Sequence, residues 1–367
     1  MKFRSERDTL SDMLATAARA VSGRASSPVL SGVMITCQGD RLTATGTDLD
    51  LTIRVESDVV GLSDGCAVIP ARLATDVVRS LEPGNVSFEA GDEVVEVSGG
   101  RSRFSLRTYP VAEFPAIGIP LDSMAWMGSS FLTGLRQVVR AASTDDSRPI
   151  LTAVLFTNDH GVVRLVATDS YRLALRDLRD VKAMPVREDI LVPARALMEL
   201  QRITAKDAAE DSGVGVISTP HEIAFKKGHA VITTRILDGK YPDYQRLIPD
   251  SYPNSLTVGK ENLLAALRRV RLLVRDNTTP VRLSMRAGGV DLSVISHEIG
   301  DANETVDGDF SGTEIMIAFN PAYLIDGVDA VDSDEVVIET NDPSRPATVR
   351  SSDADDFRYL LMPVRVS

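Results

Sequence analysis

The stretch Pro28-Val-Leu-Ser-Gly-Val-Met-Ile-Thr36 returns later in the chain as Pro149-Ile-Leu-Thr-Ala-Val-Leu-Phe-Thr157, a step of 149 − 28 = 121 residues. The pair Thr47-Asp48 returns as Thr168-Asp169 with the same step. The units of solenoid proteins have only about 20–50 residues, so a repeat of this length is a whole domain. The chain therefore contains tandem copies of one domain.

Segments that contain proline extend the repeat to three copies. Pro70-Ala71-Arg72 returns as Pro193-Ala194-Arg195, and a more diverged copy follows at Asn320-Pro321-Ala322. Stretches rich in proline at 109–128 and 241–253 should form stiff connectors, because proline restricts its own backbone and that of the residue before it. Three copies in 367 residues have the usual domain size of about 100–150 residues. The connectors predict these domains: 1–120, 128–250 and 253–367.

Each copy repeats one order of elements, namely a helix, strands, a second helix and further strands. Apolar residues at helical spacing mark the opening helices, the third of which covers 261–275. The second helices begin at a proline, which suits the first turn of a helix. They cover approximately 70–81, 193–203 and 321–330. Strand-like runs around polar turns, such as 29–37 with 41–46, predict antiparallel hairpins. The fold class is therefore α+β, with two helices packed on antiparallel sheets in each copy.

The composition is that of an acidic protein with few cysteines. The net charge of −12 by itself argues against a nucleic-acid partner, but charge is screened over about 8 Å, so a basic inner surface can accompany an acidic outer one. No apolar run is long enough to span a membrane, and the charged start of the chain lacks a signal-peptide core. Cys37 and Cys66 form no disulfide framework, which favours a reducing cytoplasm. Their apolar surroundings predict two buried thiols.

Catalytic and metal-binding motifs are absent from the sequence. It has no phosphate-binding glycine loop and no nucleophile elbow. The four histidines are scattered without a partner at metal-ligand spacing. The acidic run Ser351–Asp356 lacks the spacing of a calcium loop and predicts a solvated hairpin turn. We therefore expect no catalytic residue, no metal and no cofactor.

Arginine occurs on every predicted helix except the last. In helix 261–275, Arg268, Arg271 and Arg275 share one stripe opposite the apolar face. Such a stripe is either a solvated face or a surface that follows a phosphate backbone without reading bases. Leu272 and Leu264 lie outside the apolar stripe of this helix, and an exposed Leu272 could begin a subunit interface.

A third group of segments connects the second and third copies: Thr168–Leu173, Lys240–Leu247 and Tyr359–Val366. An apolar tail with a proline inside is most often an edge strand. The alternative is a groove, lined by Leu and Met, that takes an extended peptide.

Three motifs on this triplicated chain resemble the bacterial DNA polymerase III beta subunit family, the sliding clamps. They are Ala167-Thr-Asp-x-x-Arg-Leu-Ala174, Tyr241-Pro-Asp-Tyr244 and Met362-Pro-Val-Arg365. The resemblance implies a homodimer that closes head to tail into a six-domain ring, with twelve helices lining the hole. Such a ring encircles double-stranded DNA without sequence specificity. It tethers DNA polymerase III through its alpha subunit, and it binds the clamp loader, other DNA polymerases and repair proteins through a linear peptide.

The resemblance also implies site residues. The peptide pocket comprises Leu155, Thr168, Ser170, Tyr171, Arg172, Leu173, Pro242, Arg246, Leu247, Leu360, Leu361, Met362, Pro363, Val364 and Arg365. Relatives often have Gly-His where this chain has Ser170-Tyr171. The DNA contacts are Arg24, Arg136, Arg140, Arg195 and Arg202. The dimer interface comprises Phe104, Leu106, Leu272, Leu273, Glu298, Asp301 and Glu304, and the acids face a basic neighbour such as Arg72.

Two other classes of function are weighed against the clamp. A metal-dependent hydrolase is disfavoured because no nucleophile–base pair or ligand cluster is present. A repeat scaffold that binds peptides but no DNA is disfavoured by the arginine-bearing helices.

Overall fold

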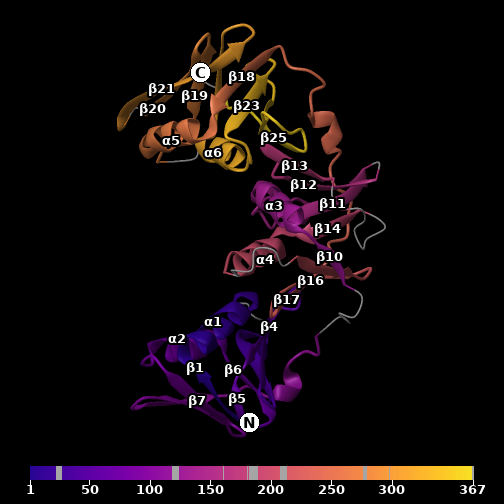
Figure 1. The fold of residues 1–367 in the computed structure, drawn as a ribbon, viewed down its shortest axis with the longest axis vertical. Helices are drawn as coiled ribbons and strands as arrows, with labels where there is room; N and C mark the ends of the chain where they lie inside the picture. Colours follow the sequence, from indigo (N-terminus) through magenta and orange to yellow (C-terminus); the bar gives the residue numbers. More distant parts are fainter. Residues whose placement is uncertain are drawn as a thin grey trace. The chain divides into compact units, whose positions relative to one another are not determined.

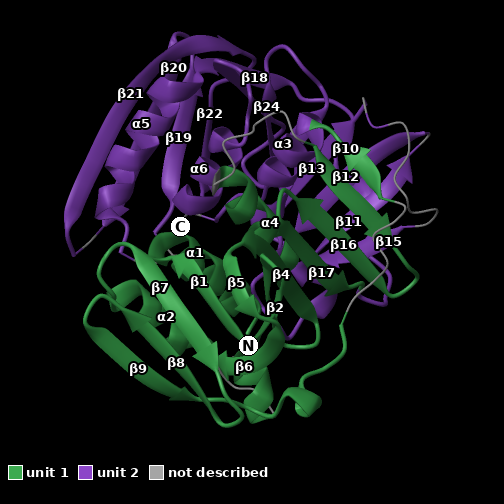
Figure 2. Ribbon diagram, turned by 60° about the horizontal axis from the view of Figure 1, so that its bottom comes forward, with its two compact units in different colours: residues 1–128, 195–236 green, residues 129–194, 237–367 purple. Residues whose placement is uncertain are grey.

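A computed structural model describes residues 1–21, 27–117, 124–159, 161–179, 181, 189–206, 213–275, 279–296 and 298–365. The chain forms two compact units, and each unit joins parts of different repeats (Figure 2). Unit 1 comprises Met1–Gly128 and Arg195–Ile236, and unit 2 comprises Ser129–Ala194 and Leu237–Ser367. The central copy is thus divided between the two units.

Unit 1 contains two antiparallel sheets. The first has the strand order β5-β1-β7-β8-β9, and the second has the order β10-β15-β16-β17-β4-β3-β2-β6. The strands are β1 (Lys2–Glu6), β2 (Gly32–Gln38), β3 (Arg41–Thr47), β4 (Leu51–Asp58), β5 (Val60–Ser63), β6 (Gly65–Pro70), β7 (Asn85–Ala90), β8 (Val94–Gly99), β9 (Ser102–Arg107), β10 (Ala125–Met127), β15 (Val214–Ser218), β16 (Glu222–Lys227) and β17 (Ala230–Arg235). The pairing of β4 with β17 joins the first copy to the central copy.

The helices of unit 1 are α1 (Arg7–Ala17), α2 (Ala71–Ser80) and α4 (Ala194–Lys206). Figure 1 shows α1 and α2 side by side against the strands of the first copy. Their buried faces, including Leu10 and Val78, join the strand residues Phe3, Ile35 and Phe88 in one apolar core.

Unit 2 is built on one antiparallel sheet with the order β14-β11-β12-β13-β25-β24-β23-β18-β21-β20-β19-β22. The strands are β11 (Ala153–Asp159), β12 (Val162–Thr168), β13 (Arg172–Leu178), β14 (Ile190–Pro193), β18 (Asn254–Gly259), β19 (Val281–Arg286), β20 (Gly289–Ser296), β21 (Gly300–Ser311), β22 (Ile315–Phe319), β23 (Glu335–Thr340), β24 (Ala347–Ser351) and β25 (Phe357–Leu361). The helices are α3 (Ser129–Val138), α5 (Lys260–Val270) and α6 (Pro321–Asp329). The pairing of β13 with β25 joins the central copy to the third.

The repeated stretch begins with a tight turn rather than a strand. Residues Pro28–Ser31 and Pro149–Thr152 each form a 3-10 turn before the strand that follows. The hydroxyl of Ser31 donates to the carbonyl oxygen of Pro28 (2.6 Å), and Thr152 does the same to Pro149 (2.8 Å). Proline fixes the first backbone dihedral of the turn and the hydroxyl closes it, so the strand predicted over 29–37 starts only at Gly32.

The second helices begin where the prolines predict them. The structure has α2 at 71–80, α4 at 194–206 and α6 at 321–329. At α6 the side chain of Asn320 accepts hydrogen bonds from the amides of Ala322 and Tyr323, which caps the helix that Pro321 opens. The prediction of two helices on antiparallel sheets in each copy is confirmed.

Several expectations are corrected. The helix predicted over 261–275 ends at Val270 and continues as a 3-10 turn over Arg271–Leu273. Leu264 is buried, because the helix packs on strands over a wider arc than one apolar stripe. Cys37 is buried as expected, whereas Cys66 is exposed. The C-terminal strand is not an edge strand, because β25 lies between β13 and β24 and ends before Pro363.

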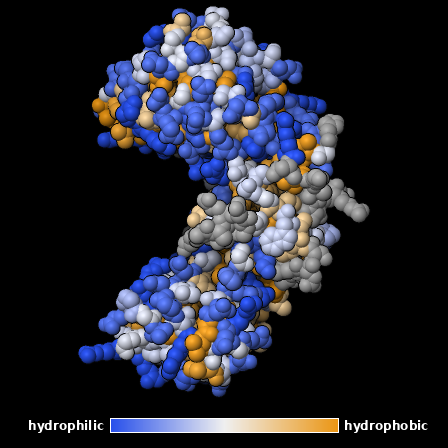
Figure 3. Space-filling model, viewed as in Figure 1, coloured by the Kyte–Doolittle hydropathy of each residue, from blue (hydrophilic) through white to orange (hydrophobic). Residues whose placement is uncertain are grey.

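The surface in Figure 3 is mostly hydrophilic, with small apolar patches between the charged side chains. The acidic run at Ser351–Asp356 forms the turn between β24 and β25, as predicted. Two of its three carboxylates are held by arginines, since Arg358 bonds Asp355 (2.7 Å) and Arg176 bonds Asp356 (2.8 Å). The turn is therefore a set of ion pairs on the surface.

A substitution at Gly327 tests how closely α6 packs on β25. A Cβ at this position would lie 2.5 Å from the ring of the fully buried Tyr359. Helix propensity alone favours alanine by about 1 kcal/mol, but overpacking costs about 1–3 kcal/mol. We expect Gly327→Ala to lower the free energy of unfolding, measured by urea denaturation. The control is Gly128→Ala, where a Cβ meets nothing within 4 Å; an equal effect of both changes would contradict this packing.

Candidate functional site

The turn after β12 sets the geometry of the candidate peptide pocket. The hydroxyl of Thr168 donates to the carbonyl of Arg172 (2.6 Å) and accepts from the amide of Ser170 (3.1 Å). The carboxylate of Asp169 accepts from the amides of Tyr171 (2.9 Å) and Arg172 (3.0 Å). These bonds hold Ser170 at φ 79°, a conformation that favours glycine. They explain how a serine is kept in a conformation that glycine adopts more easily.

Arg172 carries a buried positive charge at this turn. Its side chain is 10% exposed and bonds Asp169 (3.0 Å) and Asp326 of α6 (2.6 Å). The guanidinium also lies over the ring of Tyr323, 4.3 Å from the ring centre. Burial alone lowers the pKa of Arg172, but Tyr359 and the two carboxylates outweigh burial and raise it. The cation therefore fastens β13 to α6.

Tyr359 completes this network from the middle of the sheet. Burial raises the pKa of its phenol, although the charge of Arg172 partly opposes the shift. The phenol stays protonated at neutral pH and donates a hydrogen bond to the carbonyl of Tyr323 (2.9 Å). The turn, the sheet and α6 are thus connected by one set of polar contacts.

The predicted pocket residues divide into a buried base and an exposed rim. Leu155, Thr168, Leu173, Leu360 and Leu361 are buried; Arg172, Pro363 and Val364 are half-buried; Ser170, Tyr171, Pro242, Arg246, Leu247, Met362 and Arg365 are exposed. The chain end is held in place by its backbone, since the amide of Met362 bonds the carbonyl of Tyr171 (2.9 Å) and that of Val364 bonds Ala318 (2.8 Å). The structure therefore brings Met362 to Tyr171, and it packs Leu155, Leu173 and Leu360 in one cluster.

Sequence reasoning missed two aromatic residues of this region. Tyr241 and Tyr244 are buried and pack with Leu155, Leu173 and Leu360 in one apolar cluster. Both also line a cavity of about 270 Å³ beside Leu155 and Pro242. The Tyr-Pro-Asp-Tyr motif could have pointed to these two residues. However, the sequence alone does not show which side chains of a connector are buried.

The predicted DNA-contacting arginines lie on exposed helix surfaces. Arg24 lies outside the described residues. The other four each hold a carboxylate: Arg136 bonds Asp332 (2.6 Å), Arg140 bonds Asp329 (3.0 Å), Arg195 bonds Asp48 and Arg202 bonds Glu199. Their side chains are still about half exposed, so phosphate oxygens have access to them.

The predicted interface residues lie at strand edges and at a helix end. Phe104 is partly exposed on β9, whereas Leu106 points into the core of its own copy. Of these two residues, Phe104 therefore offers the more accessible side chain, and the contact of Leu106 with a second chain stays a prediction. Leu272 is 82% exposed, and Leu273 beside it is half-buried. Glu298, Asp301 and the expected basic neighbour Arg72 are exposed, while Glu304 already bonds Arg269 of its own chain (2.7 Å).

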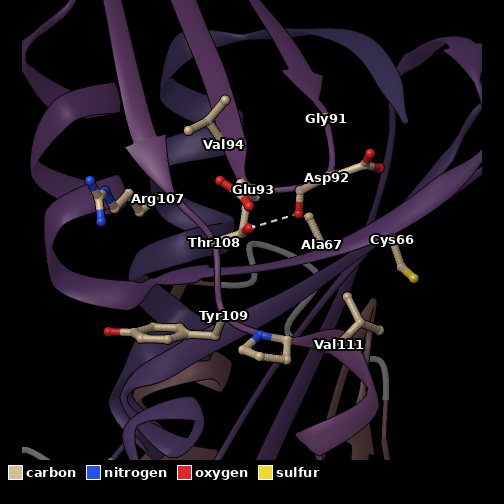
Figure 4. Close-up of a pocket in the computed structure, with 11 residues that line it drawn as sticks. Cys66, Ala67, Gly91, Asp92, Glu93, Val94, Arg107, Thr108, Tyr109 and Val111 are labelled. Carbon is tan, nitrogen blue, oxygen red and sulfur yellow. Dashed lines mark hydrogen bonds between the residues drawn. The ribbon is translucent and has the colours of Figure 1, made fainter.

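A further cavity lies apart from these sites. It has about 670 Å³ and lies in the first copy, where Cys66, Asp92, Glu93 and Arg107 line it (Figure 4). The hydroxyl of Thr108 donates across it to the carbonyl of Asp92 (3.3 Å). Within the described ranges, no group of three or more His, Cys, Asp or Glu side chains could hold a metal ion. No helix among those residues is long and apolar enough to cross a membrane.

The Arg172 network can be tested by removing the cation. We expect Arg172→Met to lower the free energy of unfolding by about 3–5 kcal/mol, because it leaves Asp169 and Asp326 without their shared partner. Urea denaturation measures the change. The control Arg246→Met breaks the exposed pair with Asp243 (2.7 Å) and should cost less than about 1 kcal/mol. An equal decrease in the free energy of unfolding for both variants would contradict a larger contribution from the buried Arg172.

Comparisons with known proteins cover the whole chain. Three domain models of the DNA polymerase III beta subunit match: the N-terminal domain at residues 1–118, the central domain at 128–243 and the C-terminal domain at 245–365. The beta sliding clamp of Streptomyces coelicolor is 33% identical over 380 residues and 100% of both chains. The beta sliding clamp of Staphylococcus aureus is 29% identical over 100% of this chain and 99% of the relative.

Solved structures agree with this similarity. The DNA polymerase sliding clamp of Bacillus subtilis matches with a TM-score of 0.89 and 28% identity, over 100% of both chains. The sliding clamp of Bartonella birtlesii, solved bound to griselimycin, matches with a TM-score of 0.90 and 29% identity over 100% of both chains. On this evidence, the chain belongs to the DNA polymerase III beta subunit family, the bacterial sliding clamps.

Proposed function

We propose that this chain is a DNA sliding clamp that closes as a head-to-tail homodimer around duplex DNA. In this role it tethers DNA polymerase III and other replication and repair proteins to DNA in the cytoplasm. The observation that carries the proposal is the match of three beta-subunit domains along the whole chain. The family consists of processivity factors rather than enzymes, so the chain acts by holding its partners on DNA.

The helix arginines support binding to DNA without sequence specificity. Contacts to phosphates position a protein on the duplex but carry no base information. Arg136, Arg140, Arg195 and Arg202 are exposed and project from helices α3 and α4 or from the turn directly after α3. A ring that holds DNA by encircling it needs only weak contacts of this kind.

Two open strand edges support the dimer. β9 is the last strand of its sheet, and among the described residues it pairs with β8 alone. β21 pairs with β20 along Gly300–Asp307 and with β18 only along Gly308–Ser311, so one edge of Gly300–Asp307 has no strand beside it among the described residues. Unpaired edges are templates for strand addition from another chain. We infer that β9 of one copy pairs with β21 of the other, with Phe104 and Leu272 packing beside the joint.

The exposed rim of the pocket supports peptide docking. Tyr171, Leu247 and Met362 present apolar surface above the buried leucines, and methionine adapts its shape to different partners. We infer that partner proteins insert apolar side chains of a short linear peptide at this rim. The network of Arg172 holds the base of the pocket rigid, which lowers the entropy lost on binding.

Retention on DNA tests the encircling ring. The clamp is assembled on nicked circular DNA by a clamp loader, and half of the sample is linearised with a restriction enzyme. We expect the clamp to remain on the circles during gel filtration and to leave the linear DNA from its ends. The DNA length and buffer are the same in both halves. Equal loss from both templates would contradict the encircling ring.

Substitutions of two exposed leucines test the pocket and the dimer interface independently. Leu247→Ser should weaken binding of the clamp-binding peptide of the DNA polymerase III alpha subunit at least about tenfold, because it removes apolar contact area at the rim. Leu272→Ser should raise the dimer dissociation constant by a similar factor. Fluorescence anisotropy measures the first effect, and analytical ultracentrifugation measures the second. Each variant is the control for the other, so a variant that impairs both activities would refute the assignment.

A further inference from the structure

The last helix is acidic where the other helices carry arginine. Asp326 and Asp329 lie in the final turn of α6, Asp332 follows three residues later, and the last turn holds no basic residue. The C-terminal end of a helix has a partial negative charge, so carboxylates there destabilise the helix. Residues that oppose a local rule of stability often serve a function.

These carboxylates hold arginines from two other helical segments. Asp332 bonds Arg136 of α3 (2.6 Å). Asp329 bonds Arg140, in the turn after α3 (3.0 Å), and lies 3.6 Å from Arg268 of α5. Figure 1 shows α6 next to both α3 and α5. Two carboxylates thus lie against three arginines, which come from α3, the turn after α3, and α5.

We infer that Asp329 and Asp332 compete with DNA phosphates for Arg136, Arg140 and Arg268, and so set how weakly the clamp holds DNA. The inference rests on the proposed function and names residues that tune it. A carboxylate and a phosphate offer an arginine the same kind of charged oxygen acceptor. An arginine that reaches for phosphate must first leave its carboxylate, so each contact gains little and is easily exchanged. Easy exchange suits a ring that slides.

The exposure of the carboxylates distinguishes exchangeable pairs from structural ones. Asp329 and Asp332 are 38% and 41% exposed, and exposed ion pairs contribute little to stability. Asp326 is excluded from this role because it holds the buried Arg172. In unit 1 the acid Glu199, which bonds Arg19 and Arg202, is buried and structural in the same way.

Uncharged hydrogen-bond donors also connect α3 to the segment that follows α6. The buried side chain of Gln137 donates to the carbonyl of Ala330 (2.8 Å) and to the carboxylate of Asp332 (3.3 Å). An asparagine at 332 keeps the second bond, because its amide oxygen also accepts. Asp→Asn changes therefore remove charge while leaving the helix contact in place.

The test compares the full-length dimer with Asp329→Asn, Asp332→Asn and the double variant. Binding to a short linear duplex is measured at a series of salt concentrations. Each arginine that gains a phosphate steepens the plot of log affinity against log salt by about 0.9. We expect the double variant to bind more tightly at low salt, with a slope steeper by about 2 to 3, and to diffuse more slowly along circular DNA.

A matched control removes the same charge elsewhere. Asp342→Asn breaks the pair with Arg345 (3.2 Å) in the loop after β23. That loop follows the far end of a strand of six residues, about 20 Å from the end next to Asp332. We expect it to leave the slope unchanged. A similar steepening in the control would overturn the inference, because net charge alone would then explain the effect.

The melting temperature separates the inference from a purely structural role. We expect the double variant to melt at the same or a higher temperature, since the helix end loses unfavourable charge. A lower melting temperature with an unchanged salt slope would overturn the inference. If the unaltered clamp is retained on circular DNA but the double variant has an unchanged salt slope, this inference is wrong and the proposed function still holds. If the unaltered clamp is not retained, the proposed function itself fails.

Discussion

The buried guanidinium of Arg172 is the interaction on which unit 2 depends. It joins the turn after β12 to α6 through Asp169 and Asp326, and Tyr359 adds a phenol from the sheet between them. A charge at this depth is costly unless carboxylates and hydrogen bonds surround it. The same contacts position the backbone carbonyl of Tyr171 that receives the chain end. The pocket and the acidic end of α6 therefore share one support.

The turn that holds Arg172 has a counterpart in the first copy of the repeat. In the first copy, Thr47 and Asp48 make the same turn, and Leu49 takes φ 81° where Ser170 takes 79°. There, however, Asp48 is held by Arg195, an exposed arginine from α4. The turn is thus an inherited feature of the domain. At the junction of the central and third copies, the same turn instead carries the buried Arg172 beside an apolar cluster.

Much of the fold could be predicted from the sequence because its signals are local. Prolines at 70, 193 and 321 mark three helix starts, and their effect acts within one turn of backbone. The pocket residues were predicted because three motifs resemble a known family, rather than from their spacing. The inward turn of Tyr241 and the exposure of Cys66 were missed, since they depend on which strand or connector covers each side chain.

The sequence by itself determined that three copies of one α+β domain follow each other, because a repeat of 121 residues is visible without any contact. It also determined that arginine lies on every predicted helix except the last. The tertiary structure alone decided which charges meet. Asp326 binds Arg172 and Asp332 binds Arg136 across 154 and 196 residues of chain. Such pairs form only when packing brings two distant surfaces together, so their partners cannot be read from local pattern.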